Sequence, residues 1–249
     1  MPGGIQYTFR NNLLFTLNMI EPDFDFRNDS KCGDPDVDSK KLYEVQKILW
    51  GKTLPSKKKF ELNFSGKGRL LLGNSEFGNF SSDRICPHFV GKFNGKFNGW
   101  LLDFECQELQ HKVRTIGGHI IFPANLRNGF TINQAKGVNR KIYDRFDLTL
   151  ECIRRFYEGE HSPLFNTFLR YKEFFELFID FSGYVEFFLL QDFIGENKQI
   201  NFSLPFDNFS RPALPQTVEE YRNYYLNTIS IINKRNHRII AELHSNLNN

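Results

Sequence analysis

Two short segments near the middle of the chain decide the fold. Residues 115–123 read TIGGHIIFP, and residues 144–157 read DRFDLTLECIRRFY. The first is a glycine turn followed by an apolar, largely β-branched run, which predicts a short buried strand that ends at Pro123. The second repeats apolar residues at three- and four-residue steps, which predicts an amphipathic helix that begins near Lys141.

The first half of the chain around these segments has a mixed pattern. Apolar residues spaced along 42–49 predict a helix that starts at an Asp38 or Ser39 cap and ends near Gly51. Residues 60–64 are strand-like, and residues 5–26 alternate loosely, which is typical of a strand or short hairpin. This half therefore predicts a small sheet accompanied by helices.

The second half has mainly helical patterns. Helical spacing recurs along residues 164–178, 184–194 and 218–247, and the last of these carries basic residues such as Arg235 towards its end, where they would complement the helix dipole. We predict an α+β fold with a small N-terminal antiparallel sheet and a predominantly helical C-terminal half. We expect residues 1–249 to form a single domain, with a mixed part at 1–140 and a helical part at 141–249.

Composition narrows the functional classes. The chain has 28 Phe among 249 residues, and aromatic rings in such number predict a ring-rich core. The net charge is only +3, so bulk attraction to nucleic acid or anionic lipid is weak, although a local basic patch would still attract phosphate. The cysteines are far apart, the N-terminus lacks a signal-peptide pattern, and no apolar run reaches about eighteen residues. We therefore expect a cytoplasmic protein without a membrane span.

Three carboxylates on the predicted helix are the first candidates for chemistry. Asp144, Asp147 and Glu151 fall at positions i, i+3 and i+7, so they would share one helix face and could hold a divalent metal. Interleaved opposite charges are also typical of a solvent-exposed, salt-bridged face. In that alternative Asp144 pairs with Arg140, while the arginines at 154 and 155 pair with the other two carboxylates.

The glycine turn supplies a second group of candidates. Gly117 and Gly118 allow a ligand or another backbone to come close, His119 could act as a general acid or base, and Arg114 could clamp an anion. Close backbone packing with a hydrogen-bonded histidine explains the same residues. Both interpretations stay open from the sequence.

Shorter motifs give weaker indications. Five residues separate Arg155 from His161, a spacing that resembles helical ribonucleases of prokaryotic immunity and toxin systems, but Gly159 would interrupt the helix. No metal ligands are assigned. The acidic turn at residues 34–38 lacks the glycine and distal glutamate of a calcium loop, and a zinc site would need an atypical half-site from the cysteines and histidines at 86, 88, 106 and 111.

Several segments together resemble a widespread family of uncharacterised bacterial proteins. The similarity runs from Phe24 to Ile240, and its most specific part is the run from Asp144 to Arg155. It implies a bacterial, intracellular, single-domain protein and no particular mechanism. The other matching segments are FRN at 26–28, DPD at 34–36, LWGK at 49–52, LP at 54–55, SSD at 81–83, TIG at 115–117, IFP at 121–123 and INQA at 132–135.

Two functions from different classes follow from these residues. The first is an enzyme that acts on nucleic acid or nucleotides, such as a toxin or phage-defence effector. The second is a non-catalytic module that binds a protein partner, with the charged helix as a structural element. The catalytic candidates are His119, Asp144, Asp147 and Glu151, and the phosphate- or ligand-binding candidates are Arg114, Gly117, Gly118, Arg145, Arg154 and Arg155.

Overall fold

The computed structural model describes residues 21–66, 68–86, 99–196 and 199–248. The strands are β1 (Asn63–Ser65), β2 (Leu71–Asn74), β3 (Gly78–Arg84) and β4 (His119–Pro123). The helices up to residue 140 are η1 (Phe26–Asp29), α2 (Pro35–Asp38), α3 (Lys40–Trp50), α6 (Asp103–Lys112), η2 (Ile116–Gly118) and α7 (Ile132–Val138). Those that follow are α8 (Phe146–Tyr157), α9 (Phe165–Arg170), α10 (Lys172–Glu176), α11 (Phe181–Phe187), η3 (Gln191–Phe193) and α12 (Val218–Asn248).

The four strands form one antiparallel sheet in the order β1-β2-β3-β4. β3 and β4 pair over five positions, with Ser82 opposite Ile121 and Arg84 opposite His119. The predicted fold class, a small antiparallel sheet followed by a helical second half, is confirmed. The strand or hairpin predicted at residues 5–26 lies mostly outside the described residues, and residues 21–26 contain no strand.

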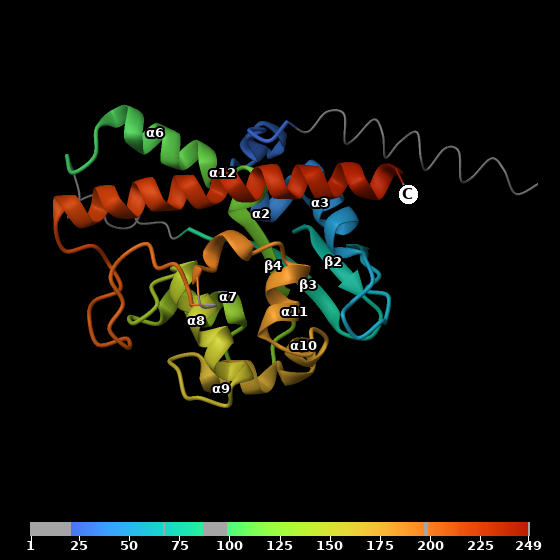
Figure 1. The fold of residues 1–249 in the computed structure, drawn as a ribbon. Coiled ribbons are helices and arrows are strands. Elements are labelled where there is room, and N and C mark those ends of the chain that lie inside the picture. Colours follow the sequence, from blue (N-terminus) through green and yellow to red (C-terminus); the bar gives the residue numbers. More distant parts are fainter. Residues whose placement is uncertain (1–20, 67, 87–98, 197–198, 249) are drawn as a thin grey trace, which may run out of the picture.

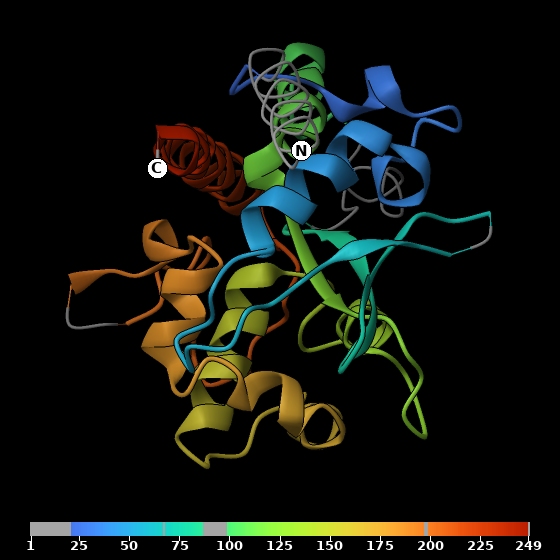
Figure 2. The ribbon, with the colours of Figure 1, turned by 90° about the vertical axis from the view of Figure 1, so that its right-hand side faces the viewer.

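The long helix α12 organises the arrangement of the other helices. Figure 1 shows α12 crossing the whole molecule, with α6 along one side of it and α8 to α11 on the other. Figure 2 looks along α12 and shows α2 and α3 on the opposite side of the molecule from α8 to α11. Buried apolar side chains from both halves pack into one cluster. The single-domain assignment stays a prediction.

Local sequence signals explain where several elements begin and end. Ser39 caps α3, since its hydroxyl accepts a hydrogen bond from the Leu42 amide at 3.1 Å, and Gly51 follows the last helical residue, as predicted. The helix predicted over residues 184–194 is shorter, because α11 ends at Phe187 and Leu189 adopts a φ of 53°. A left-handed residue ends a helix, so the chain turns there into η3.

The two faces of β3 contact different helices. Successive side chains of a strand point to opposite faces. On one face Ser82 accepts a hydrogen bond from Gln46 of α3 at 2.9 Å. On the other, Ser81 accepts one from Asn133 of α7 at 3.2 Å. Polar and charged side chains of β3 therefore lie in the interior on both sides of the sheet.

Candidate functional site

The start of α8 differs from the prediction. The helix begins at Phe146 and not near Lys141. Asp144 precedes it with a left-handed φ of 65°. Only Asp147 and Glu151 of the three predicted carboxylates lie on the helix, so the shared face of three carboxylates is wrong. The turn formed before the helix redirects the Asp144 side chain, as its contacts show.

Asp144 belongs to a buried ionic group beside the sheet. The ammonium of Lys136, which is fully buried, lies 2.6 Å from Asp83 Oδ2 and also contacts the Asp144 carboxylate. The predicted partner Arg140 forms no ion pair with any described residue. Burial, together with the nearby carboxylates of Asp144 and Asp36, raises the pKa of Asp83 to about 7 against the opposing charge of Lys136. Burial would lower the pKa of Lys136, but its two carboxylate partners outweigh burial and raise it.

His119 lies on the other face of the sheet and is also buried. Its Nδ1 atom is 3.1 Å from Asp36 Oδ1 and 3.4 Å from Ser82 Oγ. A Ser-His-Asp relay needs the serine and the carboxylate on different ring nitrogens, and here both contact the same one. Burial would raise the pKa of Asp36, but the charge and hydrogen bond of His119, with help from Ser82 and Arg84, hold it well below its usual range.

The glycine turn packs against protein. A Cβ on Gly117 would lie 2.6 Å from both Asn236 Oδ1 and the Ile232 carbonyl oxygen of α12. A Cβ on Gly118 would lie 2.4 Å from the Val113 carbonyl oxygen. Both glycines therefore permit close contact between backbone segments. This geometry matches the packing interpretation of the turn.

Arg114, the predicted anion clamp, is partly buried at the end of α6. It donates a hydrogen bond from Nη1 to the Gln110 carbonyl oxygen at 2.7 Å. Burial lowers its pKa, and the positive charges of Arg84 and Arg27 lower it further. The carboxylates of Asp25 and Asp34 act in the opposite direction, so the charge of Arg114 is already balanced in part by neighbouring acids.

Arg145 and Asp147 form a closed pair in the interior. Arg145 Nη2 lies 2.5 Å from Asp147 Oδ2, and its Nη1 donates to the Ala213 carbonyl oxygen at 2.8 Å. Asp147 also accepts hydrogen bonds from the amides of Leu148 and Ser203. The cavity beside it measures about 10 Å³, which is room for one water at most. This pair fastens residues 203–213 to the start of α8.

Glu151, Arg154 and Arg155 form the part of the predicted site that reaches the surface. Glu151 accepts two hydrogen bonds of 2.8 Å from Arg154 and one of 2.7 Å from Arg155. Arg154 also pairs with Glu158. Burial would raise the pKa of Glu151, but the two arginines outweigh burial and lower it. The predicted pairing of the two carboxylates with these arginines holds for Glu151 but is wrong for Asp147, whose partner is Arg145.

Two hollows meet at Arg155. The first, here the basic hollow, has a volume of about 610 Å³ and is lined by Arg140, Lys141, Arg155 and His161 among others. The second, here the aromatic hollow, has a volume of about 790 Å³ and shares Arg155 in its wall. Its other main lining residues are Glu151, Arg154, Tyr157, Phe181, Phe202 and Phe206.

The candidates from the sequence are thus divided among separate places. His119 lies on one face of the sheet, Asp144 on the other, and Arg145 with Asp147 at the buried start of α8. Among the described residues, no group of three or more His, Cys, Asp or Glu could hold a metal ion. The zinc ligand His88 considered from the sequence lies outside the described residues. The open location that remains is the C-terminal part of α8.

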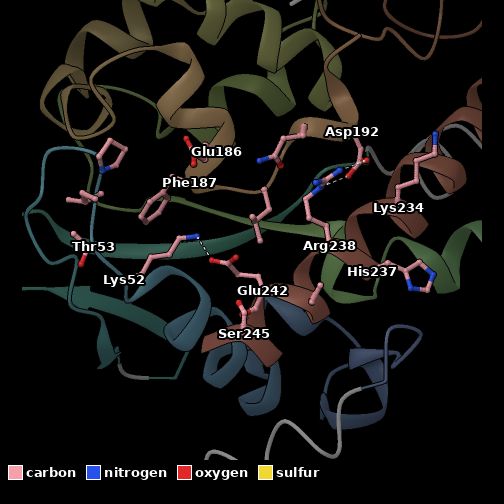
Figure 3. Close-up of a pocket in the computed structure, with 15 residues that line it drawn as sticks. Lys52, Thr53, Glu186, Phe187, Asp192, Lys234, His237, Arg238, Glu242 and Ser245 are labelled. Carbon is pink, nitrogen blue, oxygen red and sulfur yellow. Dashed lines mark hydrogen bonds and ion pairs between the residues drawn. The ribbon is translucent and has the colours of Figure 1, made fainter. Parts of the chain in front are cut away.

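A third hollow was not anticipated from the sequence. It has a volume of about 970 Å³ and lies between the second half of α12, residues 52–55 and residues 186–192 (Figure 3). Two ion pairs lie along it: Lys52 with Glu242 at 3.3 Å and Arg238 with Asp192 at 3.0 Å. Most of its charge is therefore compensated within the protein.

Arg235 is the second feature that the sequence analysis missed. It is fully buried, and its guanidinium donates hydrogen bonds to the carbonyl oxygens of Gly117, His119, Phe188 and Leu189. Burial lowers its pKa to about 10. Its predicted role at the helix end was wrong, because it joins α12 to the sheet and to the segment after α11. A signal existed, since position 235 falls in the inward apolar stripe of α12.

Comparison with known proteins gives a family but no activity. None of the described helices has the length and apolar character that a membrane crossing needs. No curated protein and no solved structure matches the chain. The model of a family of unknown function (DUF6994) matches residues 20–239, which confirms the expected resemblance to an uncharacterised family. The chain therefore belongs to the DUF6994 family of unknown function.

Proposed function

We propose that this protein acts on nucleic acid or nucleotides and binds their phosphate in the basic hollow beside α8. The supporting observation is the lining of that hollow. Arg140, Lys141, Arg155 and His161 line it, and no acidic side chain does among the described residues. Clustered basic side chains attract phosphate, whereas the chain as a whole carries only +3.

Arg155 is held ready for a ligand. Its Nε donates to Glu151, and its guanidinium lies 5.8 Å from the ring centre of Phe206 and 5.1 Å from that of Phe209. These contacts fix the side chain, and no described residue accepts a hydrogen bond from Nη1 or Nη2. A fixed guanidinium with free donors fits a phosphate in a bidentate manner.

The other cations of the basic hollow are uncompensated. Arg140 and Lys141 are exposed and form no ion pair with any described residue. Together with Arg155, which pairs with Glu151, they place three permanent positive charges on one hollow. The ion pairs at the start of α8 and beside the sheet, in contrast, are complete.

His161 gives the same hollow a group able to transfer protons. It is exposed, lines the hollow with Arg155, and packs its ring 4.6 Å from that of Phe165. An imidazole can donate or accept a proton near neutral pH, and a guanidinium stabilises charge that develops on phosphate. α8 ends at Tyr157, so the two residues do not share a helix, but both reach the basic hollow. This arrangement is suited to phosphate ester hydrolysis, and our proposal assigns that activity to a bacterial, cytoplasmic effector.

Binding of labelled RNA and DNA oligonucleotides, measured by fluorescence anisotropy at low salt, tests this proposal. We expect Arg140→Ala/Lys141→Ala to weaken binding about tenfold, because two phosphate contacts are lost. The matched control Lys31→Ala/Lys40→Ala removes the same charge at exposed positions outside the hollow and should change binding little. Equal affinity for both double variants would contradict the proposed site, and no binding by the wild type would contradict the function.

A second experiment addresses catalysis. Oligonucleotide integrity is followed with wild type and His161→Ala, and we expect cleavage by the wild type alone with binding retained in both. Growth and cellular RNA are then compared during induced expression of the two proteins. Intact nucleic acid and normal growth with the wild type would contradict the effector role.

One observation favours the alternative, a non-catalytic protein-binding module. Leu126 and Phe130, in the loop after β4, are 73% and 55% exposed. The loop is held in place, since Arg170 of α9 donates to the Phe130 carbonyl oxygen at 2.9 Å. Neighbouring exposed apolar side chains on a fixed loop are typical of protein contacts. Sedimentation velocity of wild type and Leu126→Ser/Phe130→Ser over a concentration series would detect self-association through this loop.

A further inference from the structure

We infer that the ligand is an unpaired nucleotide whose base enters the aromatic hollow while its phosphate occupies the basic hollow. This inference rests on the proposed function and adds the substrate class: single-stranded nucleic acid or a free nucleotide, as opposed to a duplex. Both sources share the same chemistry, a purine or pyrimidine ring joined through a sugar to phosphate. The two hollows are suited to the two ends of that unit.

The aromatic hollow contains a stacking platform. The rings of Phe202 and Phe206 are parallel, with centres 4.2 Å apart and planes inclined by 12°. Both side chains are partly exposed, and both line the hollow with Phe181. Flat aromatic surfaces of this kind bind the faces of unpaired bases, and they do so with little dependence on sequence.

The acids of the aromatic hollow favour a neutral base there over a phosphate. Glu151 is bound by Arg154 and Arg155, and Glu158 by Arg154. Asp180 accepts a hydrogen bond from the Gly183 amide at 2.8 Å at the start of α11. A phosphate in this hollow would lie near three carboxylates, whereas a neutral base would not be repelled. Phosphate is therefore directed to the basic hollow.

Uncommitted polar groups lie beside the platform. The side chains of Ser182 and Gln199 line the aromatic hollow, are exposed, and form no hydrogen bond with any described residue. A hydroxyl and an amide can donate to and accept from the edge of a base. Stacking with edge recognition requires a base that is free of its pairing partner.

Arg155 connects the two ends of the ligand. It lines both hollows and lies over Phe206, one of the two rings of the platform. Base and phosphate of one nucleotide are separated by a single sugar, so two hollows that share a wall residue can hold both. Paired bases in a duplex have their faces covered by their neighbours, which denies them the platform.

The test compares four probes on the full-length chain: a labelled single strand, the duplex of the same sequence, adenosine monophosphate and inorganic phosphate. We expect the single strand to bind at least tenfold more tightly than the duplex. Phe202→Leu should weaken the single strand and the nucleotide about tenfold, because one stacking contact is lost, and should leave competition by inorganic phosphate unchanged. Phe202→Trp should restore affinity, while Phe104→Leu, at an exposed ring on α6, serves as the matched control.

The outcomes separate this inference from the proposed function. Equal binding of single strand and duplex, or unchanged affinity in a folded Phe202→Leu variant, overturns the single-strand assignment but leaves the phosphate site intact. If inorganic phosphate no longer competes with the labelled strand in Arg140→Ala/Lys141→Ala, this result supports the phosphate site in the basic hollow independently. Circular dichroism spectra and melting temperatures establish that each variant is folded. If the single strand binds and adenosine monophosphate does not, the ligand is a nucleic acid polymer. If adenosine monophosphate binds and the single strand does not, the ligand is a free nucleotide.

Discussion

Charged residues in two regions of this protein behave in opposite ways. Beside the sheet, the Lys136 ammonium is fully buried between the carboxylates of Asp83 and Asp144. In the basic hollow, Arg140 and Lys141 are exposed and form no ion pair with any described residue. Buried ions persist when they are paired, whereas exposed unpaired cations contribute little to stability. The interior charges are therefore bound to one another, whereas these surface cations are not compensated by any described residue.

The largest expected effect on stability comes from removing Lys136 from the buried ionic group beside the sheet. Lys136→Met leaves two carboxylates in the interior without their cation, so we expect a loss of about 3–5 kcal/mol in the free energy of unfolding. Denaturant unfolding monitored by circular dichroism measures it. Lys141→Met, at an exposed lysine of the basic hollow, is the control and should change stability by less than about 0.5 kcal/mol. A small loss for Lys136→Met would show that the buried group is dispensable.

The next effect concerns pH. The pKa of Asp83 rises from 3.8 to about 7 on folding, so the folded state binds more protons than the unfolded state between these values. Stability should therefore fall as pH rises from about 4 to 8, by a contribution on the order of 4 kcal/mol. Asp36 has a lowered pKa, so its contribution is lost instead as pH falls below 3.8. The measurement is the urea midpoint across this pH range in wild type and in Asp83→Asn. The midpoint should depend less on pH in the variant. An unchanged pH dependence would show that other groups cause it.

A smaller effect is expected at Glu151, the carboxylate of α8 that pairs with two arginines. Glu151→Gln weakens the hydrogen bonds that hold Arg154 and Arg155, which predicts a loss of about 1 kcal/mol. The pKa of Glu151 lies below 4.5, so its contribution is complete above that pH and is lost as pH falls through the folded-state pKa. Thermal unfolding at pH 7 and at pH 3.5 measures both effects. Glu158→Gln, at an exposed acid, is the control. An equal loss of stability in both variants would contradict the larger contribution expected of the buried Glu151.

The smallest stability effect should accompany the double variant Arg140→Ala/Lys141→Ala. Neither side chain pairs with a described residue, so we expect a change within about 0.5 kcal/mol. Added oligonucleotide should raise the melting temperature of the wild type, because a ligand that binds the folded state stabilises it, and should have little effect on the variant. A large loss of stability without ligand would show that Arg140 and Lys141 stabilise the fold, as the buried charges do.

Local signals made much of the fold predictable. The strand at His119–Pro123 and the helix after Ser39 lie where the sequence indicated, because apolar spacing, caps and proline act over a few residues. The start of α8 was not predictable in this way. The apolar spacing continues through Ile142, but the Asp144 amide donates to the Lys136 carbonyl oxygen at 2.9 Å and Asp144 takes a left-handed φ. A tertiary contact overrides the periodicity there.

The candidate site was only partly predictable. Arg155 and Glu151 were identified because charges four residues apart on a helix must meet. Phe202 and Phe206 were not, because they line the hollow beside α8 only after the chain returns to that helix. The buried partner of His119 is Asp36, which lies 83 positions away in the sequence. Spacing along a chain carries no information about such a contact.

The sequence by itself determined the class of fold, the position of the strand from His119 to Pro123, and a helix whose last turns carry paired charges. These properties follow from interactions within a few residues. Only the tertiary structure decided which charges are neutralised, because sheet register and helix docking set the partners of Asp144, Asp147 and His119. It also decided that Arg155 faces two hollows, since those hollows form between segments that the chain brings together only when it folds.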